Sequence, residues 1–311
     1  MVRSATERLH PMAEGLDALP GGEVLHRLLS GQEAALAAVR RALPAIEAGA
    51  EAMAAAIRGG GRLVYAGAGS SALMANADGM ELPGTYGIAP ERILLLMAGG
   101  LPRDAHMPGD TEDDADEAVR AAEAVRAGDT VIAVTASGRT PYPVAVARIA
   151  RARGARVIAI ANNEGAGIFD HADVAICLPT PPEIIAGSTR MGAGTAQKAA
   201  LNMMSTLMAI RLGAVHDGMM VGLVADNDKL RGRARGMVAA IAGVTEEAAE
   251  AALEAGAGVV KPAVLIARGL TPAAAVEHLA ASGGNLRAAL ARIEATGQTD
   301  RTIRTNKGSM T

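Results

Sequence analysis

Short apolar runs alternate along the middle of the chain with longer stretches of helical periodicity. The runs predict buried strands at residues 62–66, 92–97, 129–135, 156–160 and 174–178. The stretches between and after them predict helices at residues 71–81, 112–126, 142–153 and 194–212. Strands that alternate with helices in this way predict an α/β fold built on a doubly wound, five-stranded parallel sheet.

The sequence on either side of this region has a helical pattern without strands. Residues 1–30 predict a loose arm with a short helix near 22–29, and residues 32–58 predict an alanine-rich helix or a pair broken near Pro44. Three short helices and a helical tail after Asn285 are expected near the other end, at 245–254, 260–268 and 271–279. We therefore expect an N-terminal arm with helices, an α/β domain, and a C-terminal helical module with a tail, at residues 1–58, 59–242 and 243–311.

Composition and charge narrow the classes of function. The formal net charge of −3 and the presence of only four aromatic residues give no reason to expect nucleic-acid binding. No apolar run approaches the ~18 residues that a membrane span needs, and the start of the chain has no signal-peptide core. The single cysteine, Cys177, excludes a disulfide framework, and the six scattered histidines show no metal-ligand spacing. We expect a cytoplasmic protein with no metal site that binds neither nucleic acid nor membrane.

Two of the predicted strands end in loops of small hydroxylated residues. The strand at 62–66 leads into Gly67-Ala68-Gly69-Ser70-Ser71, and the strand at 129–135 leads into Ala136-Ser137-Gly138-Arg139-Thr140. Such turns offer hydroxyl and N–H groups to an anion, and ligands of doubly wound sheets bind at the carboxyl ends of the strands. A dinucleotide is disfavoured, because Met97-Ala98-Gly99-Gly100 has no carboxylate after the second strand. A phosphate-bearing small molecule is the expected ligand, bound by Ser70, Ser71, Ser137, Gly138, Arg139 and Thr140.

A third polar segment, residues 187–198, leads into a long apolar helix. It can be a capped helix start with Thr195 as the N-cap residue. Alternatively, this segment grips an anionic ligand with Ser188, Thr189, Arg190 and Lys198.

Two glutamates are candidates for acid–base chemistry. Glu81 lies at the expected end of a helix, just before a Pro/Gly turn, where a carboxylate opposes the helix dipole. Glu112 lies in an acidic cluster that, in its simpler interpretation, forms the first turn of a helix capped by Asp110 or Thr111. Both can be solvated surface residues. If both face a sugar phosphate, two carboxylates with different pKa values can divide the roles of acid and base.

Together these segments resemble the N-acetylmuramic acid 6-phosphate etherases over nearly the whole chain. The resemblance rests on five segments in the family's order and spacing: residues 67–71, 81–87, 112–114, 135–142 and 187–198. It implies a sugar-isomerase (SIS) type, flavodoxin-like domain with a ubiquitin-associated-like (UBA-like) helical module. It also implies a homodimer with its site near the subunit interface, and no metal or organic cofactor.

The resemblance further implies cleavage of the D-lactyl ether of N-acetylmuramic acid 6-phosphate, which gives N-acetylglucosamine 6-phosphate and D-lactate in peptidoglycan recycling. In this reaction a base removes the C2 proton of the open-chain aldehyde, lactate leaves from C3 with help from an acid, and water adds to the unsaturated aldehyde. Glu81 matches the acid of the family, and Glu112 matches the base. Ser70, Ser71, Ser137 and Thr140 match positions that bind the sugar phosphate.

Two positions depart from the family pattern, and both departures remove a positive charge. Leu73 stands where the family's first loop has an arginine, and Gly192 stands where it has a lysine. Two other functions therefore stay open on the same fold: a regulator that binds a sugar phosphate without cleaving it, and an aldose–ketose phosphate isomerase.

Overall fold

The computed structural model describes residues 5–107 and 109–295. It divides into two compact units. One contains the residues up to Glu81 together with Ala89–Met208, and the other contains Leu82–Ile88 together with the residues from Ala209 onward. The domain boundaries expected after residues 58 and 242 stay predictions. Within the described residues, no helix combines the length and the apolar character needed to cross a membrane.

The first unit contains one sheet of five parallel strands. The strands are β1 (Leu63–Gly67), β2 (Ile93–Met97), β3 (Thr130–Thr135), β4 (Arg156–Ala161) and β5 (Val174–Cys177). Their spatial order is β2-β1-β3-β4-β5, which confirms the predicted doubly wound sheet in its flavodoxin-like form. The chain order reverses between the neighbouring strands β1 and β3. This topological switch point is where such sheets bind ligands.

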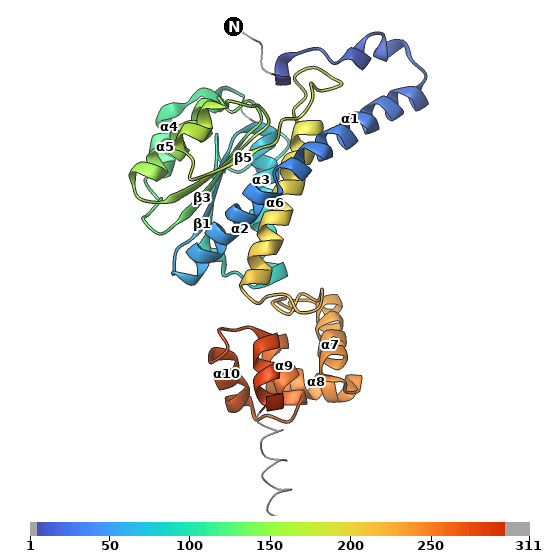
Figure 1. Cartoon of the computed structure of the whole chain (residues 1–311), viewed down its shortest axis with the longest axis vertical. Coiled ribbons are helices and arrows are strands. Elements are labelled where there is room, and N and C mark those ends of the chain that lie inside the picture. The colour runs from blue at the N-terminus through green and yellow to red at the C-terminus, as the bar shows by residue number, and fades with distance from the viewer. Residues whose placement is uncertain (1–4, 108, 296–311) are drawn as a thin grey trace, which may run out of the picture. The chain divides into compact units, whose positions relative to one another are not determined.

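One face of the sheet is covered by α4 (Ala115–Ala122) and α5 (Pro141–Ala152), as Figure 1 shows. Fully buried strand residues such as Val64 and Ala133 pack there with helix residues such as Val146. Many of the contacting side chains are alanines, so the helices can approach the sheet closely.

The opposite face is covered by α2 (Leu43–Arg58), α3 (Gly69–Tyr86) and α6 (Gly192–Arg211). Buried polar contacts tie these helices to the strands: the Thr130 hydroxyl donates to the carbonyl of Ala52 in α2 at 3.3 Å. The carboxyl ends of β1 and β3 therefore lie between two helical layers.

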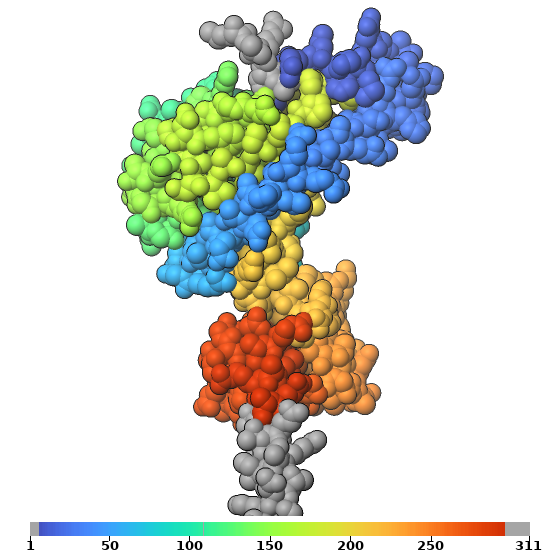
Figure 2. Space-filling view, in the orientation of Figure 1, coloured from blue at the N-terminus to red at the C-terminus, as the bar shows by residue number. Residues whose placement is uncertain are grey.

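The N-terminal helix is longer than predicted. Instead of a short helix at 22–29, α1 extends over Gly21–Arg41, with Ala42 as its C-cap residue. The next helix, α2, starts directly after Ala42. Pro44 in the first turn of α2 marks the predicted break, since proline is tolerated there. The loop before α6 lies against α1 in Figure 2. At this contact Ile184 is so close to Gly31 that a Cβ on the glycine would lie 2.8 Å from the isoleucine side chain.

Two predicted helix ends are wrong. The helix predicted to stop at residue 81 continues past Pro83 to Tyr86, because Leu82 is almost completely buried and its packing outweighs the local preference to end the helix. The helix predicted from residue 112 starts only at Ala115. Asp110–Asp113 form a separate 3-10 turn, and Asp114 caps α4 by accepting a hydrogen bond from the Glu117 N–H at 2.7 Å.

The second unit has its own helical core. It contains α7 (Asp228–Ala242), α8 (Glu246–Ala255), α9 (Val260–Ala267) and α10 (Pro272–Ala280), packed around buried aliphatic residues. The last three helices and the helical residues 286–295 confirm the sequence prediction, whereas α7 was not predicted. Thr245 and Thr271 cap α8 and α10 with their hydroxyls, as their positions indicated. Residues 296–311, most of the expected tail, lie outside the described residues.

A buried carboxylate holds α3 and α6 against β1. Asp78 accepts hydrogen bonds from the Tyr65 hydroxyl at 2.8 Å, the Asn202 amide at 2.7 Å and the Ser205 hydroxyl at 2.8 Å. Burial and the charge of Asp78 raise the pKa of Tyr65 well above 10.0, so the phenol stays a donor at neutral pH. One residue therefore satisfies three donors, of which the Tyr65 and Ser205 hydroxyls are buried.

We expect Asp78→Ala to lower the free energy of unfolding by about 3 kcal/mol, because it leaves these three donors without an acceptor. Urea denaturation measures the change. Asp116→Ala, at an exposed position of α4, is the matched control and should stay within about 0.5 kcal/mol of the unchanged protein. Equal stability of the two variants would contradict the role given to Asp78.

Candidate functional site

The first loop of the site joins β1 to α3 at the switch point. Gly69 begins α3, and Ser70 and Ser71 form its first turn, with Ser71 buried and Ser70 partly exposed. The Ala98 N–H donates to the Gly67 carbonyl at 3.1 Å, which fixes this loop beside the end of β2. The first N–H groups of a helix have no partner within the helix, so this turn can receive an anion.

Glu112 reaches this loop from the 3-10 turn before α4. A Cβ added to Gly69, whose φ is +51°, would overlap Oε1 of Glu112. Glycine suits this position because of its backbone conformation, and any side chain here would also displace the carboxylate of Glu112. Burial and the charge of Asp113 raise the pKa of Glu112 above its ordinary value of 4.5. A carboxylate with a raised pKa in an open site is suited to proton transfer.

The second loop, between β3 and α5, gathers three hydroxyl groups. Thr135 Oγ1 lies 3.0 Å from Thr140 Oγ1 and 3.5 Å from Ser137 Oγ. Ser137 Oγ lies 3.3 Å from Thr140 Oγ1. The backbone N–H groups of Gly138 and Arg139 donate to this cluster at 3.3 and 3.2 Å. Thr140 is the N-cap residue of α5, but its hydroxyl makes no capping hydrogen bond and instead belongs to the hydroxyl cluster.

The conformation of this loop depends on Gly138. Its φ is +74°, and an added Cβ would overlap the side chain of Ala166. The helix that follows offers few backbone donors, because Pro141 and Pro143 have no N–H and only Tyr142 provides one in the first three positions. Of the hydroxyl and N–H groups that the sequence pattern indicated, this end of α5 thus presents mainly the hydroxyls. The side chain of Arg139 is exposed.

Glu117 of α4 binds the backbone just after the end of β2. Both of its carboxylate oxygens lie 3.1 Å from the N–H of Gly99. Burial raises the pKa of the Tyr142 phenol to about 12, and the charge of Glu117 contributes to this rise. Glu117 therefore ties α4 to the end of β2. Among residues 5–107 and 109–295, the carboxylate of Glu112 at the first loop has no hydrogen-bond partner.

The third predicted segment, residues 187–198, lies at the start of α6. The capping role expected of Thr195 is taken by Glu183. Thr195 is not the N-cap residue: α6 starts at Gly192, and Thr195 donates a short hydrogen bond to Gln32. The buried carboxylate of Glu183 accepts from the N–H groups of Gly192 and Ala193 at 2.8 Å each. This helix end is therefore already occupied by an internal anion.

The predicted binding residues near α6 are still accessible. Ser188 and Thr189 are partly exposed, and Arg190 and Lys198 are exposed. The start of α6 borders the carboxyl ends of the strands, since Asn162, directly after β4, donates to the Ala193 carbonyl at 3.4 Å. A ligand can reach these side chains, but not the N–H groups that Glu183 holds.

The fold does not bring Glu81 close to the other candidate site residues. It is an exposed residue inside α3 rather than at its end, twelve positions after Gly69. At 1.5 Å per residue, its Cα lies about 18 Å along the helix from the turn that Glu112 contacts. Within one chain, Glu81 and Glu112 are too far apart to act on neighbouring atoms of one small molecule.

Several residues of the site were missed by sequence reasoning. Glu117 had a local signal, because Asp114 and Glu117 have the spacing of a capping box. Glu183, Asp78 and Asn162 had none, since each bonds to a helix or strand far away in the chain. Among residues 5–107 and 109–295, no group of three or more His, Cys, Asp or Glu side chains could hold a metal ion.

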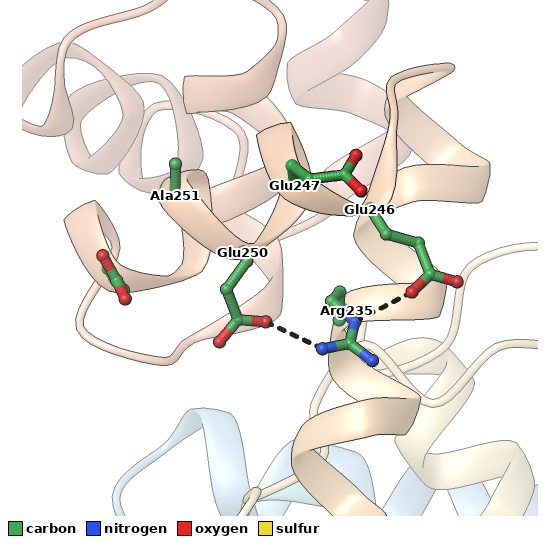
Figure 3. A pocket seen from close by; sticks show the side chains of 6 residues that line it. Arg235, Glu246, Glu247, Glu250 and Ala251 are labelled. Carbon is green, nitrogen blue, oxygen red and sulfur yellow. Dashed lines mark ion pairs between the residues drawn. The ribbon is translucent and has the colours of Figure 1, made fainter.

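The second unit contains a cavity of about 450 Å³ with a different character (Figure 3). Glu246 and Glu250 of α8 point toward Arg235 of α7, with ion-pair distances of 3.1 and 3.5 Å. Glu247 and Glu254 also line this cavity. Four carboxylates around one guanidinium repel a phosphate, so the sheet edge is the better candidate site.

Comparison with known proteins gives one consistent result. Residues 31–162 match the SIS domain family model. The N-acetylmuramic acid 6-phosphate etherase of Deinococcus radiodurans is 41% identical over 295 residues, which cover 94% of this chain and 97% of that protein. The etherase of Geobacillus thermodenitrificans is 40% identical, with coverage of 92% and 98%. That of Streptomyces avermitilis is 41% identical, with coverage of 92% and 93%.

Proposed function

Because the chain belongs to the N-acetylmuramic acid 6-phosphate etherase family, we propose that it cleaves the D-lactyl ether of N-acetylmuramic acid 6-phosphate. The products are N-acetylglucosamine 6-phosphate and D-lactate. The observation that carries this proposal is the position of Glu112 over Gly69, beside Ser70 and Ser71 and one strand away from the hydroxyl cluster. A proton-transfer group and a phosphate-binding loop thus share one edge of the sheet.

The hydroxyl cluster of Thr135, Ser137 and Thr140 is suited to the phosphate. The three oxygens lie within 3.5 Å of one another at the end of β3, so they can donate to the oxygens of one phosphate group. Arg139, Ser188, Thr189, Arg190 and Lys198 remain proposed ligand contacts around the rim. With the phosphate on these hydroxyls, we place C2 and C3 of the sugar toward the first loop.

In the proposed reaction the carboxylate of Glu112 removes the proton from C2 of the open-chain aldehyde. The electron pair forms the C2–C3 double bond, and the C3–O bond to lactate breaks with a proton supplied by Glu81. Water then adds at C3 of the unsaturated aldehyde and restores the saturated sugar. The raised pKa of Glu112 supports its role, because a base with a pKa nearer to neutral transfers a proton more effectively.

We propose that Glu81 comes from a second copy of the chain. The separation of about 18 Å along α3 argues against joint action of Glu81 and Glu112 of one protomer. Glu81 is exposed, and its neighbour Met80 is 60% exposed on the same helix, so both side chains are accessible to a second subunit. The active species is then a homodimer, which we place in the cytoplasm, with each site shared by two subunits.

The direct test mixes the purified protein with N-acetylmuramic acid 6-phosphate and measures D-lactate enzymatically. Release of D-lactate and N-acetylglucosamine 6-phosphate in equal amounts supports the lyase. Binding without release favours the non-catalytic sugar-phosphate regulator, and a ketose phosphate formed without lactate favours the isomerase. We include these alternatives because Leu73 stands where the family pattern has an arginine, so a positive charge is missing from the first loop.

Ser137→Ala is expected to raise the KM for N-acetylmuramic acid 6-phosphate roughly 10-fold or more, since a hydrogen bond to a charged group contributes about 1.5–3 kcal/mol. Steady-state kinetics with the D-lactate assay measures this change. Unphosphorylated N-acetylmuramic acid is the matched control ligand, and its affinity should not change in the variant. An equal loss for both ligands would remove Ser137 from the phosphate site.

A further inference from the structure

A second cavity, of about 720 Å³, lies at the carboxyl end of β2. It is formed by one continuous segment that leaves the strand at Met97 and extends to Met107, and its lining includes Leu101, Arg103 and His106. The size is within the range of small-molecule sites. None of the residues that line this cavity has a part in the reaction described above.

The cavity adjoins the site of Glu112. Met97 is paired with Gly67 in the register of β2 and β1, and the next residue, Ala98, donates to the Gly67 carbonyl at 3.1 Å. Gly69, which Glu112 contacts, is two residues further on. Neighbouring strands are about 4.8 Å apart, so a ligand bound at the first loop can extend into the cavity without leaving the sheet edge.

Arg103 supplies the cavity with a cation that is available to a ligand. Its side chain is exposed, and no ion pair joins it to another of the described residues. Asp104 also lines the cavity, and its carboxylate accepts from the His106 N–H at 2.7 Å. Glu117, the other acid near the cavity floor, is held by the N–H of Gly99. The arginine is therefore free to meet an anion from outside the protein.

We propose that Arg103 binds the carboxylate of the lactyl group and so selects sugar phosphates that carry this second anion. The inference rests on the proposed function. The substrate has a phosphate on C6 and a carboxylate on the substituent at C3, so it needs two anion sites. The hydroxyl cluster lies at the end of β3, and the cavity that Arg103 lines begins at the end of β2. These two strand ends are two strand spacings apart, or about 10 Å.

The test compares two ligands that differ only in the lactyl group. Calorimetry measures the affinity of N-acetylmuramic acid 6-phosphate and of N-acetylglucosamine 6-phosphate for the full-length Glu112→Gln variant, which binds without turnover. Adding Arg103→Gln should weaken binding of the first ligand about 10- to 100-fold, as expected for loss of a charge-assisted hydrogen bond, and leave the second unchanged. With Arg103→Lys in place of Arg103→Gln, the affinity for N-acetylmuramic acid 6-phosphate should lie between that of the Glu112→Gln parent and that of the Arg103→Gln variant. Arg126→Gln, at an exposed position just before the start of β3, is the control.

Two results would overturn the subsite: an equal loss for both ligands, or no loss for either. The outcome is separate from that of the lyase itself. If the unchanged protein releases no D-lactate but Arg103→Gln still weakens only the muramic ligand, the subsite stands and the lyase fails. If D-lactate is released and Arg103→Gln leaves the KM unchanged, the lyase stands and the subsite fails.

Discussion

Glu112→Gln is expected to lower kcat for D-lactate release by a factor of about 10² to 10⁴, the usual contribution of a general base. The amide keeps the shape of the side chain over Gly69 but cannot accept the C2 proton. Single-turnover assays with N-acetylmuramic acid 6-phosphate measure the loss, and binding of the same compound should persist. A variant with undiminished turnover would remove Glu112 from the reaction.

The pH dependence of the unchanged protein follows from the same residue. A base must be ionised to act, so kcat/KM should fall as the pH drops through the pKa of Glu112. Burial and Asp113 raise that pKa above 4.5, so the acidic limb should lie above the position expected for an ordinary glutamate. Asp113→Asn removes a neighbouring negative charge and should move the limb to lower pH. If the acidic limb does not move, it reports the titration of a group other than Glu112.

The thermal stability of the Glu112→Gln variant is the control for its loss of activity. Because the folded state raises the pKa of Glu112, it binds the proton more tightly than the unfolded state, and ionised Glu112 opposes folding. The stabilising contribution of the protonated form is complete below the unfolded pKa and is lost as the pH rises through the folded pKa. Glu112→Gln should therefore not lower Tm at neutral pH. A variant that is inactive but as stable as its parent has lost chemistry rather than fold.

Mixing two inactive variants should restore activity. In a dimer of one Glu81→Gln subunit and one Glu112→Gln subunit, one of the two shared sites keeps both glutamates. Random exchange makes half of the dimers mixed, so about a quarter of the unchanged activity should return. The measurement is the rate of D-lactate release after the two variants are unfolded together, refolded and compared with each variant treated alone.

The matched control is a mixture of the Glu112→Gln subunit with a subunit that carries both substitutions. Every shared site in that mixture lacks Glu112, so no activity should return. If the first mixture also stays inactive although mixed dimers are detected by mass spectrometry, the two glutamates do not meet across an interface. The proposed division of acid and base between subunits would then be wrong.

The sheet was predictable from the sequence because its strands are buried on both faces. Each strand appears as a short, continuous apolar run, and five such runs separated by helices have few topologies open to them. Helix ends were less predictable, because they depend on tertiary contacts. Pro83 signalled the end of a helix, but the burial of Leu82 carries α3 past it.

The candidate site was predictable where its parts are local. Ser70, Ser71, Ser137 and Thr140 follow directly from strands, and parallel strands bring their carboxyl ends to one edge. Contacts made from a distance had no local signal, as the capping of α6 by Glu183 in place of Thr195 shows. The separation of Glu81 from Glu112 required the structure, because it depends on which end of α3 Glu112 approaches.

The two prolines at the start of α5 have a consequence for the form of phosphate that the enzyme accepts. A backbone N–H can only donate, but a hydroxyl both donates and accepts. A phosphate monoester changes between one and two negative charges near pH 6, and the singly charged form carries a P–OH group that needs an acceptor. The cluster of Thr135, Ser137 and Thr140 can turn its protons to suit either form. Recognition of the ester should therefore tolerate the substrate's own titration, even where the chemistry at Glu112 does not.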